Sequence, residues 1–273
     1  MSRFGIELAS VFGMPPVEHA RLAAELGCSY ITIGLSSPAR NPENYPQWSL
    51  RTDAALRREF KAVLGALGIA VAIGEGATVL PQVEVDDYAA DLDLYAELGA
   101  QRIGTRCLDP DLDRSIGQFG RLAEMTAERG FRATTLEYAP YHPLNHLDKA
   151  VAMIARVGMP NFRLLIDVMH LYRSGSTPAD VALLSPDIIE YIQVCDIRME
   201  PGGNDYLTEA TRERLVPGAG EIPLRELLSI IPEHVPLGIE VPMMRMAEAG
   251  VGALDRLRPC VEALKAMLPG EPH

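Results

Sequence analysis

Short hydrophobic runs alternate along this chain with longer segments in which hydrophobic residues recur every three or four positions. The short runs fit buried strands, and the longer spacing is typical of helices that bury one face. Strands that alternate with helices predict βα repeats and a parallel sheet. The eight expected strands cover residues 4–9, 30–34, 69–74, 102–107, 132–137, 162–167, 189–193 and 236–240.

Glycine follows several of the expected helices at the step to the next strand. Glycine directly after a helix adopts positive φ at little cost, so it is typical of a helix end. A 273-residue chain is close to the roughly 250 residues of one (β/α)8 barrel. We therefore expect a single (β/α)8 TIM barrel, one α/β domain over residues 1–273. The expected helices cover 17–26, 52–67, 86–98, 115–128, 147–157, 178–184, 224–231 and 252–267.

Four consecutive expected strands end in a residue with a side-chain oxygen, namely Glu137, Asp167, Gln193 and Glu240. In a (β/α)8 barrel the strands' carboxyl ends carry the active site. One buried carboxylate could belong to a salt bridge, but four oxygens on neighbouring strands favour a metal site. An all-oxygen set suits Mg²⁺ or Mn²⁺ better than Zn²⁺. With a dication, three carboxylates leave a charge of −1, which an arginine or the substrate environment would need to tolerate.

His170 follows Asp167 in an Asp-x-x-His step. Histidine titrates near neutrality, so His170 is a candidate for proton transfer. A loop histidine bonded to the backbone is the alternative. His142 and His146, in the loop after Glu137, are interpreted as solvated.

Other charged residues near expected strand ends are weaker candidates for substrate binding. Arg198 could hold a substrate oxygen, although a surface ion pair would explain it as well. Arg214 opens a glycine-rich segment between the last two strands, where barrels often bind phosphate, but its spacing matches no P-loop. The remaining candidates for lining the site are Glu7, Glu75 and Arg106.

The composition narrows the partners. A net charge of −12 argues against nucleic acid, which requires clustered Lys and Arg. No apolar run approaches the length of a membrane span, and the N-terminus lacks a signal-peptide pattern. We expect a soluble cytoplasmic protein that binds a small molecule. A homodimer is only a general expectation for soluble enzymes.

The strand-end motifs resemble those of the xylose-isomerase-like TIM barrels, the sugar phosphate isomerase/epimerase group. The motifs are Glu137, Asp167-x-x-His170, Gln193-x-x-Asp196 and Glu240. The resemblance implies a divalent metal at these strand ends, often Mn²⁺ or Mg²⁺. It also implies that Glu137 and Glu240 act as a proton-transfer pair.

Two features depart from most epimerases of this group. Gln193 stands where they carry histidine, and the strand over 30–34 lacks the acidic residue often found at its end. Glutamine at that position is similar to bacterial 3-dehydroshikimate dehydratases, a lyase branch of the same superfamily. That branch also shows an Arg-x-x-Pro-Gly-x-Gly segment, which here starts at Arg214.

These observations predict a metal-dependent isomerase or epimerase that removes a proton next to the carbonyl of a small sugar or hydroxy-ketone. A lyase similar to 3-dehydroshikimate dehydratase, with the same metal site, is the alternative. A non-catalytic binding barrel is disfavoured by the intact oxygen set. A metal endonuclease is disfavoured by the acidic charge and by six histidines that mostly lie outside the strand ends.

Overall fold

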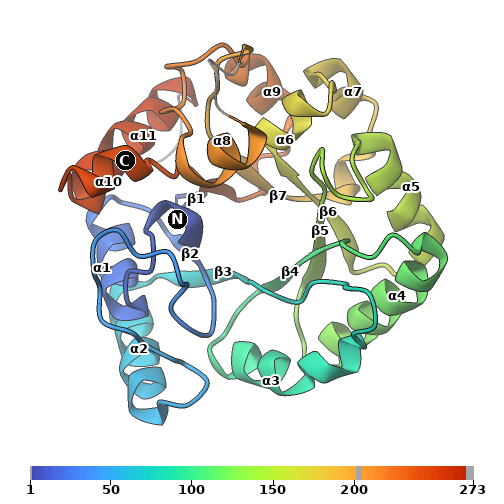
Figure 1. Ribbon diagram of the computed structural model, residues 1–273, viewed down its shortest axis with the longest axis horizontal. Coiled ribbons are helices and arrows are strands. Elements are labelled where there is room, and N and C mark those ends of the chain that lie inside the picture. Colours follow the sequence, from blue (N-terminus) through green and yellow to red (C-terminus); the bar gives the residue numbers. More distant parts are fainter. Residues whose placement is uncertain (1, 201–204, 269–273) are drawn as a thin grey trace. The chain divides into compact units, whose positions relative to one another are not determined.

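The computed structural model describes residues 2–200 and 205–268, which contain eight strands. The strands follow one another around a closed barrel in the order β1 to β8, with helices between them, as Figure 1 shows. The predicted (β/α)8 TIM barrel is therefore confirmed. The strands are β1 (Phe4–Ile6), β2 (Tyr30–Ile33), β3 (Ala70–Gly74), β4 (Arg102–Arg106), β5 (Ala133–Glu137), β6 (Phe162–Asp167), β7 (Ile189–Val194) and β8 (Leu237–Ile239).

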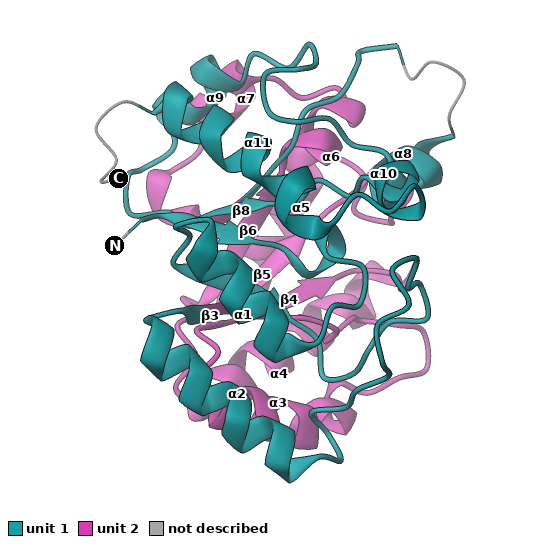
Figure 2. Ribbon diagram, turned by 90° about the vertical axis from the view of Figure 1, so that its left-hand side faces the viewer, with its two compact units in different colours: residues 1–70, 193–273 teal, residues 71–192 magenta. Residues whose placement is uncertain are grey.

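The chain forms two compact units, coloured separately in Figure 2. The first unit comprises residues 1–70 and 193–273, and the second comprises residues 71–192. The boundaries between them fall within β3 and β7. No helix among residues 2–200 and 205–268 is long and apolar enough to cross a membrane.

In the first unit, β1 lies between β2 and β8 and pairs in parallel with both. Gly5 of β1 faces Tyr30 so closely that an added Cβ would lie 2.8 Å from the Tyr30 Cβ. Glycine is thus required where these two strands approach. The helices of this unit are α1 (Pro16–Glu25), α2 (Ala54–Leu67), α8 (Tyr206–Arg212), α9 (Leu224–Ile230), α10 (Met244–Glu248) and α11 (Ala253–Met267).

In the second unit, β5 pairs in parallel with β4 and β6, and helices cover the sheet. Phe119 of α4 packs on Phe162 of β6, with their ring centroids 5.1 Å apart. The register of β4 against β5 places Arg106 beside Glu137 at the ends of these two strands. The helices here are α3 (Ala89–Glu97), α4 (Leu112–Glu128), α5 (Leu147–Val157), α6 (Val168–Arg173) and α7 (Pro178–Ala182).

Helix ends follow the local rules that the sequence suggested. Gly68 after α2 and Gly158 after α5 adopt the left-handed conformation, with φ of 67° and 69°. Asp53 and Asp111 cap the starts of α2 and α4 by accepting backbone N–H groups. Such caps satisfy amides that have no partner within the helix.

Two kinds of detail differ from the expectation. Strand β1 ends at Ile6, because Leu8–Ser10 forms a 3-10 turn in which Ser10 donates its N–H to the Glu7 carbonyl. Helices α6, α8 and α10 lie in segments that we expected to be loops. They span only five to seven residues, too short for helical periodicity to stand out in the sequence.

Candidate functional site

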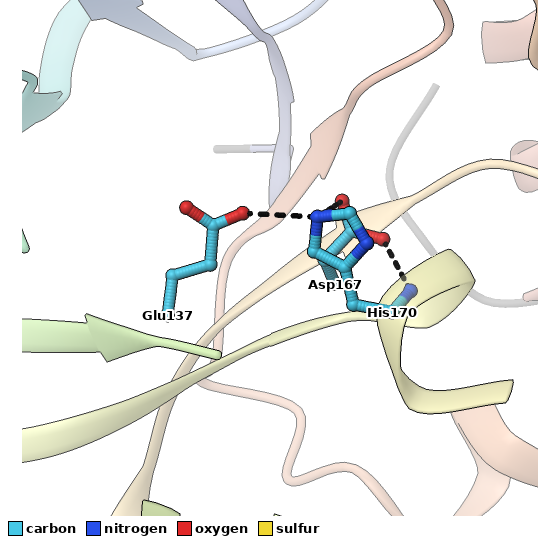
Figure 3. A group of neighbouring side chains, drawn as sticks. All are labelled: Glu137, Asp167 and His170. Carbon is cyan, nitrogen blue, oxygen red and sulfur yellow. Dashed lines mark hydrogen bonds and ion pairs between the residues drawn. The ribbon is translucent and has the colours of Figure 1, made fainter. Parts of the chain in front are cut away.

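Glu137, Asp167 and His170 form a group in the second unit, drawn in Figure 3, in which Asp167 and His170 are buried and Glu137 is half-buried. One ligand atom from each residue lies within 4.8 Å of the others. The His170 Nε2 is 3.4 Å from Glu137 Oε1 and 3.8 Å from Asp167 Oδ2. Two carboxylates and an imidazole at these distances can bind a metal ion or exchange a proton.

The Asp-x-x-His step creates this geometry locally. Asp167 ends β6 and caps α6, because its Oδ1 accepts the N–H groups of Met169 at 2.7 Å and His170 at 3.2 Å. The cap fixes the first turn of α6, which carries His170. One oxygen of Asp167 therefore shapes the backbone, while Oδ2 faces the imidazole.

Opposing effects set the charge of Glu137. Burial raises the pKa of this carboxyl, but the hydrogen bond from His170 and the positive charge of Arg106 outweigh burial and lower the pKa below its usual range. Arg106 stands beside Glu137 in the register of β4 and β5. Glu137 is thus held as a carboxylate, ready to bind a cation or accept a proton.

His142 belongs to the surroundings of this group, contrary to our interpretation of it as a solvated loop residue. It is half-buried, and a turn in which its N–H bonds the Ala139 carbonyl folds it back toward β5. Burial lowers its pKa, and the charges of Glu137, Arg106 and His170 also act on it. A lone loop histidine gives no such signal in sequence. The His146 Nδ1, by contrast, lies 2.8 Å from Asp148 Oδ1.

Glu75 lies just past the end of β3 and is half-buried. Its backbone carbonyl accepts a hydrogen bond from the Tyr95 hydroxyl. Its carboxylate passes over Gly104 of β4, where an added Cβ would lie 3.0 Å from Glu75 Oε2. Gly104 therefore makes room for this acidic side chain.

In the first unit, Gln193 of β7 is held by Glu7, which follows β1. The Gln193 Nε2 donates to Glu7 Oε2 at 3.2 Å, and both side chains are buried. The Gln193 carbonyl oxygen is also buried and has no hydrogen-bond donor among the described residues. A buried acceptor without a donor is costly, so this oxygen is suited to a cation.

Glu240, directly after β8, is paired with Arg214. The Arg214 Nη1 lies 2.8 Å from Glu240 Oε2, and its Nε donates to the Ala210 carbonyl at 3.0 Å. The Arg214 side chain is only 3% exposed, so its charge is little screened by solvent. This arginine supplies a positive charge beside one of the carboxylates that we predicted as metal ligands.

Asp196 organises the glycine-rich segment that follows Arg214. Its carboxylate accepts the N–H groups of Ile197, Gly218 and Ile222 at 2.8–3.0 Å. It is fully buried, so its role is to hold this segment against the end of β7. Arg198, two residues further on, is exposed.

Comparisons with known proteins identify the family. Residues 20–260 match the family model of the xylose isomerase-like TIM barrel. The chain belongs to the xylose isomerase-like TIM barrel family. A search of curated proteins found no match.

Solved structures of other proteins share this fold. A structure of the IolI protein with a binding zinc atom has a TM-score of 0.80 at 15% identity, covering 100% of this chain and 99% of that one. D-psicose 3-epimerase in the presence of D-fructose has a TM-score of 0.71 at 15% identity, covering 99% and 100%. The probable 3-DHS dehydratase AsbF from Bacillus anthracis has a TM-score of 0.74 at 14% identity, covering 97% and 99%. Such likenesses concern the fold.

Within this xylose isomerase-like barrel, the residues predicted from sequence fall into two sets. Glu137, Asp167 and His170 come together in the second unit, with Arg106 beside Glu137. The first unit contains the contacts Gln193–Glu7 and Glu240–Arg214. The joint four-residue metal set stays a prediction, because its members belong to both units.

Proposed function

We propose that the protein is a divalent-metal-dependent enzyme that removes a proton next to the carbonyl of a small sugar or hydroxy-ketone. Return of that proton to another face or carbon makes it an epimerase or isomerase. The observation that supports this proposal best is the close approach of Glu137, Asp167 and His170. It combines carboxylates that suit a cation with an imidazole that suits proton transfer.

The donor atoms fit a hard divalent cation. Asp167 keeps Oδ2 available while Oδ1 caps α6, and Gln193 offers a buried carbonyl oxygen without a donor. We propose Glu137, Asp167, Gln193 and Glu240 as the residues that would hold Mn²⁺ or Mg²⁺. When bound, the cation would polarise the substrate carbonyl and stabilise negative charge on its oxygen.

The side chains supply the proton transfers. A carboxylate oxygen of Glu137 or Glu240 takes the proton from the carbon next to the carbonyl, and the other glutamate, which enters the step in its carboxylic acid form, gives its proton to that carbon. The lowered pKa of Glu137 favours its deprotonated form at neutral pH. His170 Nε2, 3.4 Å from Glu137 Oε1, can take over the proton when this nitrogen carries no hydrogen of its own. Arg214 balances the charge of Glu240.

Dehydration is the second candidate, and Gln193 favours it through its similarity to the dehydratase branch. The first step is the same, with the α-proton passing to a carboxylate. The β-hydroxyl then leaves as water, taking a proton from His170 Nε2, and a carbon–carbon double bond forms. The chain's own residues therefore provide the acid and the base for either outcome.

The test starts from metal-free protein incubated with Mn²⁺ in D₂O and followed by proton NMR. One substrate is 3-dehydroshikimate, and the others are a panel of ketohexoses. Deuterium entering a sugar beside its carbonyl supports epimerisation, whereas formation of protocatechuate supports the dehydratase. If neither reaction occurs with any substrate, both candidate activities fail.

Variants then assign the residues. Glu137→Gln should lose activity and bound metal, while Glu124→Gln, on the exposed surface of α4, should keep both. His170→Asn should lose activity but keep metal if His170 carries protons, and should lose metal if its imidazole is a ligand. Full activity and metal content in Glu137→Gln would overturn the proposed site.

A further inference from the structure

Glu7 and Gln193 form a contact that has no role in the proposed proton transfers. They are 186 residues apart in sequence, yet Gln193 Nε2 donates to Glu7 Oε2 at 3.2 Å. Strand β8 lies between them, since Glu7 donates its N–H to Ile239 and Glu240 donates its N–H to Val194. The two side chains therefore meet across an intervening strand.

The same Glu7 oxygen receives a second hydrogen bond. Thr32 of β2 donates its hydroxyl to Glu7 Oε2 at 3.0 Å and accepts the Leu8 N–H at 2.9 Å. Glu7 is thus tied to neighbouring backbone through Thr32. All three side chains are buried, with Glu7 only 1% exposed.

This arrangement decides which end of the Gln193 amide points away from Glu7. An ionised carboxylate accepts hydrogen bonds but cannot donate them, so it must face the NH₂ group of an amide. The carbonyl oxygen of Gln193 then points the other way, where it is buried without a donor among the described residues. Without Glu7, the amide could turn and present an NH₂ group, which repels a cation.

We propose that Glu7 is a positioning residue for the metal site: its carboxylate holds the Gln193 amide so that the carbonyl oxygen faces the divalent cation. This inference rests on the proposed function, because it takes Gln193 as a ligand. By accepting a hydrogen bond from the amide N–H, Glu7 also polarises the amide and makes its oxygen a stronger metal ligand. Glu7 acts through Gln193 and does not bind the cation.

The experiment measures Mn²⁺ affinity by calorimetry on the full chain with Glu7→Leu, Gln193→Leu and the double variant. Loss of a partner that orients a metal ligand weakens binding by about 10- to 100-fold. Glu7→Leu should show such a loss in the natural background and no further loss in the Gln193→Leu background. Glu7→Gln, which keeps an acceptor oxygen, should recover part of the affinity. The visible absorption of Co²⁺-loaded protein should change in Glu7→Leu.

Glu190→Gln is the matched control, because Glu190 is also buried and lies on the same strand as Gln193. It pairs with Arg102 and Arg132, and its removal should leave Mn²⁺ affinity unchanged. Circular dichroism of the metal-free variants checks their folding. If Glu7→Leu does not fold, Glu7→Gln takes its place in the same cycle, with a smaller expected loss.

The outcomes separate the inference from the proposal beneath it. If the natural protein binds no Mn²⁺, the proposed function fails. If it binds Mn²⁺ but Glu7→Leu weakens binding equally with and without Gln193, the positioning role is wrong. Unchanged affinity in both Glu7 variants also overturns it.

Discussion

Replacing Asp196 by asparagine should destabilise the protein, whereas the same change at Asp53 should not. Both aspartates accept backbone hydrogen bonds, but they use their oxygens differently. Asp53 takes the N–H groups of Ala55 and Leu56 on Oδ1 alone. Asp196 uses both oxygens, since Oδ1 binds two backbone N–H groups and Oδ2 binds the Gly218 N–H at 2.8 Å.

The expected cost follows from counting the donors that lose a partner. An asparagine at position 53 keeps Oδ1, so both cap bonds survive, and Asn caps helices as well as Asp does. An asparagine at position 196 that keeps Oδ1 turns its NH₂ group toward the Gly218 N–H, and two donors then face each other. A buried amide without an acceptor costs about 1–3 kcal/mol. The hydrogen bond from Gly218 is only partly buried, although Asp196 itself is fully buried, so we expect about 1–2 kcal/mol.

Urea unfolding followed by circular dichroism measures this difference. Asp196→Asn should lower the free energy of unfolding by about 1–2 kcal/mol, and Asp53→Asn should stay within about 0.5 kcal/mol of the natural protein. Hydrogen exchange at Gly218 should become faster in Asp196→Asn. If the two variants unfold at the same urea concentration, Asp196 does not hold the glycine-rich segment and the reasoning is refuted.

Three further predictions concern stability. Gly220→Ala should destabilise the protein, because the new Cβ would lie 2.3 Å from both Asp196 Oδ1 and the Ile197 carbonyl. Gly117→Ala in α4 meets nothing within 4 Å and should stabilise the protein by about 0.5–1 kcal/mol. Thermal melts of both variants measure this difference. Burial lowers the pKa of His19 from 6.5 to about 4, so as the pH falls the unfolded chain binds a proton before the folded protein does. The free energy of unfolding should therefore fall by about 3 kcal/mol between pH 6.5 and pH 4. Urea unfolding across this range should show that His19→Phe lacks this loss, and parallel pH profiles of the two proteins would contradict the prediction. Glu190→Gln should cost about 3 kcal/mol, because Glu190 lies 2.7 Å from the buried Arg102 guanidinium; a urea midpoint equal to that of the natural protein would contradict this.

The sequence predicted the barrel because its signals are local. Strand runs, helical spacing and glycine at helix ends each depend on a few neighbouring residues, as at Gly68 and Gly158. The group of Glu137, Asp167 and His170 could be predicted for the same reason. Asp167 and His170 share a single turn, and Glu137 ends the neighbouring strand β5.

Contacts between distant segments could not be predicted, because a single sequence does not show which side chains lie next to one another in the fold. The hydrogen bond between Glu7 and Gln193 spans 186 positions, and no spacing rule predicts it. Arg214 was predicted from the sequence as a candidate for substrate binding, but its 2.8 Å contact with Glu240 could not be predicted. His142 was interpreted as a solvated loop residue, but a turn in the structure folds it back toward β5. Local periodicity thus determined the strands, the longer helices and the residues at the strand ends. Only tertiary packing decided which of these side chains pair, and it left the buried Gln193 oxygen without a donor among the described residues.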